Sequence, residues 1–140
     1  MLPEQLVARE PALSEAFVAY VEGVRSHPAL PAGVLDACGA RIAWLLTGRT
    51  ADGATHEVDL APADGEALAA CLAFAEQFVL DAQALDERTV GRVRDAVGDA
   101  GYAVLALGVG LLEGLVRARL AWGLPPMPAT NGDADGPVAP

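Results

Sequence analysis

A long apolar run near the carboxyl end constrains the fold of this chain more than any other feature. Residues 103–116 hold one charged side chain, Glu113, among fourteen positions. The run is shorter than the roughly 18 to 20 apolar residues that a membrane span needs. It is also long for a strand and poor in β-branched side chains, which are limited to Val104, Val109 and Val116. The run therefore predicts the central, buried helix of an all-α domain.

Small residues recur along this run at intervals of four, at Ala106, Gly110 and Gly114. That spacing places them on one face of a helix. Each glycine lowers helix propensity by about 1 kcal/mol relative to alanine, and close packing against another helix is the compensation we expect. A helix that is apolar nearly all round must be covered on several sides. In a chain of this size, that cover can include another subunit.

Apolar residues at helical spacing predict further helices before the run. These helices are expected over residues 11–26, 33–47 and 63–81, with a short fourth helix from Asp86 to Gly98. The first of them should bury the side that carries Phe17 and Tyr20.

The chain is therefore expected to form a single-domain, all-α bundle of about five helices over residues 11–124. Residues 1–10 form a lead-in. Residues 125–140 are rich in Pro, Gly and Asp, and we expect a disordered acidic tail there.

Charge and composition exclude several classes of function. The formal net charge of −10 argues against nucleic acid and against anionic membranes, because phosphates would be repelled. All nine basic residues are arginines, which excludes Schiff-base chemistry on lysine. His27 and His56 have no metal-ligand spacing, and no cofactor or metal is expected. The Ala, Gly, Arg and Asp bias is typical of a GC-rich bacterial genome.

The two cysteines predict a cytoplasmic protein with buried thiols. Cys38 and Cys71 lie 33 residues apart, each within an apolar pattern. Nothing at the amino end resembles a secretory signal. The spacing gives no support for a disulfide or a redox pair.

Several short stretches resemble one known family. They are Pro11-Ala12-Leu13, then Leu30-Pro31 before a helix with an acid, an arginine five residues later and Ala43. LAACLAFAEQFVLDAQAL at residues 68–85 follows, and residues 103–125 end in LAWGLPP. Together these features resemble the alkylhydroperoxidase D and carboxymuconolactone decarboxylase family over most of residues 10–125. The resemblance implies an all-α fold and a homo-oligomer, often a trimer or hexamer, with a dimer as the alternative.

The resemblance also locates the position where the redox branch of the family carries a Cys-x-x-Cys-x-x-x-His motif. Aligned on this sequence, the helical acid falls at Asp36 and the two cysteines fall at Gly48 and Ala51. Neither residue can act as a nucleophile. The motif's histidine falls at Thr55, one place from His56. The decarboxylase branch uses a histidine without the cysteine pair, and His56 lies where that branch places it.

The resemblance and the residue types together suggest a candidate site. Asp36 and His56 would be the catalytic acid and base, while Arg41 and Trp44 would hold a small organic acid. The function would be small-molecule binding, assembly, or cysteine-free acid and base chemistry of the decarboxylase or isomerase type.

Purely structural roles for these four residues, and one other function, are the alternatives. Asp36 and Arg41 would pair with other charges, His56 would be a solvated loop residue, and Trp44 would be a core or interface aromatic. The alternative function is a thiol-dependent peroxidase that uses Cys38 or Cys71. Glu113 should have an ion-pair partner such as Arg117, because burying an unpaired carboxylate costs several kcal/mol.

Overall fold

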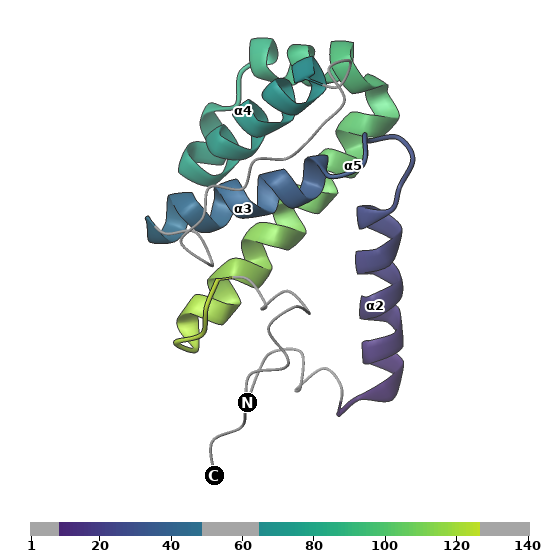
Figure 1. Cartoon of the computed structure of the whole chain (residues 1–140), viewed down its shortest axis with the longest axis vertical. Helices are drawn as coiled ribbons and strands as arrows, with labels where there is room; N and C mark the ends of the chain where they lie inside the picture. Colours follow the sequence, from purple (N-terminus) through teal and green to yellow (C-terminus); the bar gives the residue numbers. More distant parts are fainter. Residues whose placement is uncertain (1–8, 49–64, 127–140) are drawn as a thin grey trace.

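The computed structural model describes residues 9–48 and 65–126, and the regular elements in these segments are helices. They are α2 (Pro11–Arg25), α3 (Val34–Thr47), α4 (Gly65–Asp81), the short 3-10 helix η2 (Ala82–Ala84) and α5 (Glu87–Ala121) (Figure 1). The all-α prediction is confirmed. The described residues hold four α-helices where about five were expected, because the helices predicted on either side of Gly98 form the single element α5. The predicted tail beyond residue 126 lies outside the described residues.

Gly98 interrupts the helical geometry of α5. Its backbone has φ 75° and ψ 178°, a conformation that is essentially restricted to glycine. Figure 1 shows the ribbon of α5 changing direction near the top of the molecule before its long second half descends. Upstream, the Asp86 carboxylate accepts a hydrogen bond from the backbone N–H of Thr89 at 2.7 Å, which caps α5. The same bond lowers the pKa of Asp86.

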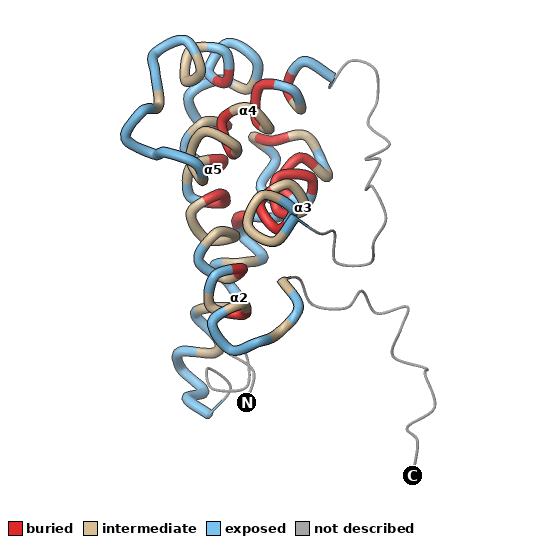
Figure 2. The backbone as a smooth tube through the Cα atoms, turned by 90° about the vertical axis from the view of Figure 1, so that its left-hand side faces the viewer, coloured by how far each residue is buried: buried red, intermediate tan, exposed pale blue. Residues whose placement is uncertain are grey.

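The core lies where α3, α4 and α5 meet. Phe74 of α4 stacks on Phe78 with ring centroids 6.1 Å apart and meets Tyr102 of α5 edge-on at 5.7 Å. Figure 2 shows the buried positions as red segments on the facing sides of these three helices. The largest fully buried side chains are Phe74, Ile42, Leu105, Val34, Val93, Val109, Val116, Cys38 and Cys71.

Two glycines of α5 allow other parts of the chain to approach closely. A Cβ atom at Gly108 would lie 2.6 Å from Leu35 Cδ2 and 3.2 Å from Val24 Cγ1. A Cβ atom at Gly101 would lie 2.9 Å from the carbonyl oxygen of Ala29. The close contacts expected at Gly110 and Gly114 are not made among residues 9–48 and 65–126, since a Cβ at either position would meet nothing there within 4 Å. The glycines of α5 that pack closely are therefore Gly101 and Gly108, and not the pair that the four-residue spacing suggested.

The amino-terminal helix α2 is attached to the bundle mainly by its carboxyl end. Val24 is its one buried residue, whereas Leu13, Val18 and Tyr20 are 56%, 54% and 43% exposed. The expectation that the Phe17 and Tyr20 side would be buried is therefore wrong for Tyr20, and Phe17 is only partly covered. Figure 1 shows α2 standing apart from the other helices along most of its length.

The apolar helices are less covered than the sequence predicted. By length and composition, Gly65–Ala84 and Glu87–Ala121 are each apolar enough to cross a membrane, a test that core helices of soluble proteins also pass. In both, 28% of the most apolar window is buried. Leu107, in the middle of the run that we expected to be central and buried, is 55% exposed. A large apolar surface of this chain therefore has no cover from the chain's own described residues.

Candidate functional site

Asp36 lies in the first turn of α3 and faces the end of α2. Its Oδ1 accepts a hydrogen bond from Arg25 Nη2 at 2.9 Å, and both side chains are more than half exposed. An exposed ion pair of this kind contributes about 0–1 kcal/mol. Asp36 therefore helps to fix the end of α2 against α3.

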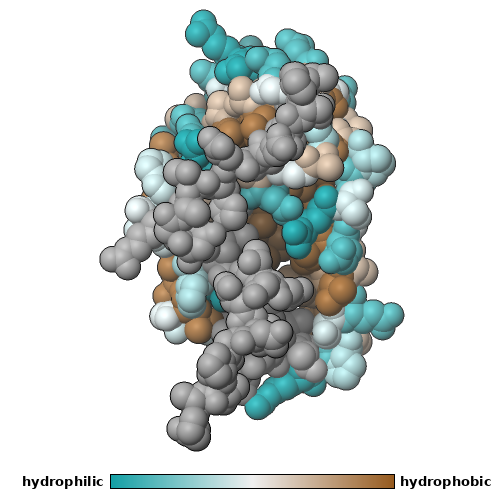
Figure 3. Space-filling model, in the orientation of Figure 1, coloured by the Kyte–Doolittle hydropathy of each residue, from teal (hydrophilic) through white to brown (hydrophobic). Residues whose placement is uncertain are grey.

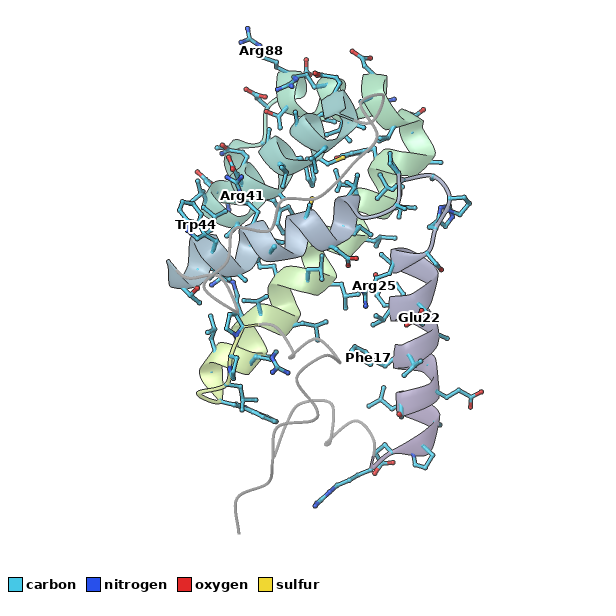
Figure 4. The ribbon with its side chains drawn as sticks, in the orientation of Figure 1. Phe17, Glu22, Arg25, Arg41, Trp44 and Arg88 are labelled. Carbon is cyan, nitrogen blue, oxygen red and sulfur yellow. The ribbon has the colours of Figure 1, made fainter. Side chains whose placement is uncertain are left out.

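Arg41 lies one and a half turns further along α3, on the side of α4. Its Nη1 is 2.6 Å from Glu76 Oε1, with 40% and 38% of the two side chains exposed. The Arg41 guanidinium also lies over the ring of Trp44, 5.8 Å from the centroid. Figure 4 shows Arg41 and Trp44 together at this end of α3, while Arg25 extends from α2.

The structure brings together only part of the predicted site. Five positions along a helix turn a side chain by about 140°, so Asp36 and Arg41 point to different neighbours, Arg25 and Glu76. Arg41 and Trp44 do lie together. His56 lies outside the described residues. Asp36 and Arg41 each form an ion pair, as expected if their roles are structural.

Both cysteines lie in the core and are free thiols with no exposed surface. Burial raises the pKa of the Cys38 thiol to about 12, with a further rise from nearby Cys71 that Arg41 partly opposes. Burial also raises the pKa of Cys71 to about 11. A reactive cysteine needs the opposite shift and an accessible sulfur. Neither thiol has the environment of a peroxidase nucleophile.

The position that aligns with the family's first redox cysteine is a helix terminus. Gly48 adopts φ 65° and its N–H donates to the Trp44 carbonyl at 2.7 Å, which ends α3. A left-handed backbone favours glycine here for a structural reason. Ala51, the second aligned position, lies outside the described residues.

The carboxyl end of α5 holds one expected ion pair and one arginine that sequence reasoning missed. Glu113 Oε1 is 2.9 Å from Arg117 Nη2, as expected. Arg119 is 6% exposed, and its Nε donates to the carbonyl oxygen of Pro125 at 2.7 Å. The bond draws the chain back over the end of α5. Spacing is the signal that could have found it, because Arg119 lies three positions after buried Val116 and so on the same side of the helix.

The described segments contain no group of three or more His, Cys, Asp or Glu side chains that could hold a metal ion. Comparison of the chain with family models, with curated proteins and with solved structures finds no match. The geometry of the described residues and their uncovered apolar surface are therefore the observations that bear on function.

Proposed function

We propose that this chain is an alkylhydroperoxidase D-like protein that lacks the redox cysteine pair and serves as a homo-oligomeric assembly protein. The observation that carries the proposal is the uncovered apolar surface of α2 and α5. Leu13, Tyr20 and Leu107 are each between 43% and 56% exposed. Exposed apolar patches on a folded chain mark sites of association.

Other observations support assembly over catalysis. The two thiols are buried with raised pKa values, and the acid and the guanidinium of the predicted site are held in separate ion pairs. On the face that Figure 3 views, hydrophobic residues reach the surface between hydrophilic ones. The acidic net charge favours a protein partner over nucleic acid or an anionic lipid surface.

The test of this proposal is the oligomeric state of the full chain. Sedimentation velocity over a wide concentration range should show a discrete oligomer that dissociates on dilution. A hydroperoxide reduction assay on the same sample should show no turnover above a sample denatured by heat. A chain that stays monomeric throughout, or reduces hydroperoxides, would overturn the proposal.

A second candidate function is binding or acid and base chemistry on a small organic acid. The observation that favours it is the pairing of Arg41 with Trp44, because a guanidinium beside an aromatic ring can hold a planar carboxylate. Glu76 occupies the guanidinium in the structure and would have to release it. Asp36 and His56 remain the proposed acid and base.

Trp44 supplies the readout for this second candidate. Its fluorescence should change when small keto acids and lactones are titrated into the protein, and the change should be lost in Arg41→Gln. Asp36→Asn tests a separate position, since its carboxylate faces Arg25 instead. His56→Ala should abolish turnover if the chain catalyses a reaction. A flat titration with the native protein would remove this candidate.

A further inference from the structure

One face of α2 is apolar along its length but covered only at one end. Leu13, Phe17, Tyr20 and Val24 follow one another at intervals of four, three and four, which aligns them on one side of the helix. Val24 is 8% exposed, whereas Leu13 is 56% exposed and Tyr20 is 43% exposed. Figure 4 shows Phe17 projecting from α2 towards the side on which α5 lies. The apolar face is therefore buried at Val24 and exposed at Leu13 and Tyr20.

Helix α5 presents a matching face with small residues. Ala103, Leu107, Gly110 and Gly114 follow at the same intervals of four, three and four. Leu107 is 55% exposed, and a Cβ at Gly110 or Gly114 would meet nothing within 4 Å. The face offers one protruding side chain beside a smooth stretch where another helix can approach closely.

The chain already makes one contact of this chemistry. At the covered end of α2, Val24 Cγ1 lies 3.2 Å from the Cβ position of Gly108, so an apolar side chain of α2 packs on a glycine of α5. Gly108 lies on a different side of α5 from Leu107, since one position turns a helix by about 100°. A second helix like α2 can therefore lie on the open face without displacing the first.

We propose that the occupant is α2 of a second copy of this chain. The inference rests on the proposed assembly function and names its interface. In a two-fold dimer, α2 of each copy lies along the face of α5 formed by Ala103, Leu107, Gly110 and Gly114 in the other, so the contact is made twice. Each contact is about 17 Å long, since both faces span eleven positions, and about 10 Å wide. Counting both surfaces of both contacts, the dimer removes on the order of 700 Å² from water, the area of a weak association that dissociates on dilution.

Charge favours a second copy over a lipid surface. Neither face carries a charged side chain, although the chain as a whole has a net charge of −10. Two copies can therefore meet there without opposing charges directly. A bilayer would have to accommodate the Glu113 and Arg117 pair one position before and three after Gly114 on α5, and an anionic surface would repel the chain.

Matched glutamine variants test the interface, because the chain offers an internal control. Leu13→Gln and Leu107→Gln each remove an apolar side chain from a proposed face. Val18→Gln removes one that is equally exposed on the same helix as Leu13 but points to another side. In sedimentation equilibrium, the first two should raise the dimer dissociation constant by about tenfold or more, since each change occurs twice. Val18→Gln should leave it within about twofold.

Cross-linking gives an independent measurement of the contact. The Leu13→Cys protein is mixed and oxidised with Ala103→Cys and, separately, with Gly114→Cys, which mark the two ends of the α5 face, so that one of the two mixtures pairs the thiols in either direction of α2. Both native thiols can stay because they are buried. A mixed disulfide dimer should form, and Val18→Cys in place of Leu13→Cys should form less. Circular dichroism melts of every variant should match the native protein at a concentration low enough for the native chain to be monomeric, since the changed residues are exposed.

The outcomes separate this inference from the proposed function. Oligomers that persist unchanged in Leu13→Gln and Leu107→Gln would overturn this interface and leave assembly standing. A native chain that is monomeric at every concentration would overturn both. Sedimentation of the native chain with phosphatidylcholine vesicles, lost in Leu107→Gln, would show that lipid covers the face and would also overturn the inference.

Discussion

Cys38 and Cys71 show how burial sets the chemistry of a residue. A thiol that is withdrawn from water ionises with difficulty, because the thiolate loses its hydration. The pKa of Cys38 is raised to about 12 and that of Cys71 to about 11. The folded protein therefore holds both groups as neutral, packed thiols. They stabilise the core, and they lack the thiolate form that a redox reaction needs.

The raised pKa values predict a loss of stability in alkaline solution. An unfolded thiol titrates near 9.0, so above that pH the unfolded state loses protons that the folded state keeps. The stabilising contribution is complete below pH 9 and declines as the pH rises towards the folded values. Urea titrations should show the free energy of unfolding falling by up to about 1.4 kcal/mol per pH unit for each thiol. Cys38→Ala should flatten this decline, and an unchanged slope would contradict the assignment.

Adding a single Cβ atom at Gly101 should lower the stability of the fold. In Gly101→Ala the new Cβ would lie 2.6 Å from Val97 Cβ and 2.9 Å from the Ala29 carbonyl oxygen. Neither of these atoms is the free end of a flexible side chain, so we expect a loss of about 1–3 kcal/mol. Gly91→Ala is the control in the same helix, where a Cβ meets nothing within 4 Å and should stabilise by about 1 kcal/mol. Thermal melts of the two variants should move in opposite directions.

At the scale of elements, Gly98 decides the course of α5. Its φ of 75° with ψ of 178° lets two helical segments meet at an angle within one element. A Cβ at Gly98 would meet nothing within 4 Å, so any effect of Gly98→Ala comes from the backbone alone. We expect a loss of about 1–3 kcal/mol, measured by urea unfolding, against no loss for Gly23→Ala in α2. Equal stability of the two variants would show that the bend does not depend on glycine.

The spacing of apolar residues predicted where the helices lie in the sequence, but it did not predict which faces of the helices pack together. The expected ranges 11–26 and 33–47 agree with α2 and α3 within one residue at each end, because apolar spacing and terminal Pro and Gly are local signals. The faces that pack were less predictable. In a helix that is apolar nearly all round, spacing alone does not show that Gly108 meets Leu35 while Gly110 stays open.

The candidate site shows the same limit. Asp36, Arg41 and Trp44 are close in sequence, but which side of α3 each occupies depends on α2 and α4. Arg25 and Glu76, their ion-pair partners, come from those other helices, 11 and 35 residues away in sequence. Sequence patterns alone did not identify either partner.

At the scale of the whole molecule, charge and apolar surface act against each other. Two copies that each carry a net charge of −10 repel one another at long range, while the proposed contact between α2 and α5 is uncharged. Salt screens the repulsion between charges that lie farther apart than the Debye length, about 8 Å at physiological ionic strength, and leaves apolar association intact. Association should therefore become tighter as sodium chloride is raised, opposite to an interface held by ion pairs. Sedimentation equilibrium at low and high salt measures this directly, with Leu107→Gln as the control that should stay mostly monomeric at both. Weaker association of the native chain at high salt would indicate that charged residues, and not the apolar faces, hold the copies together.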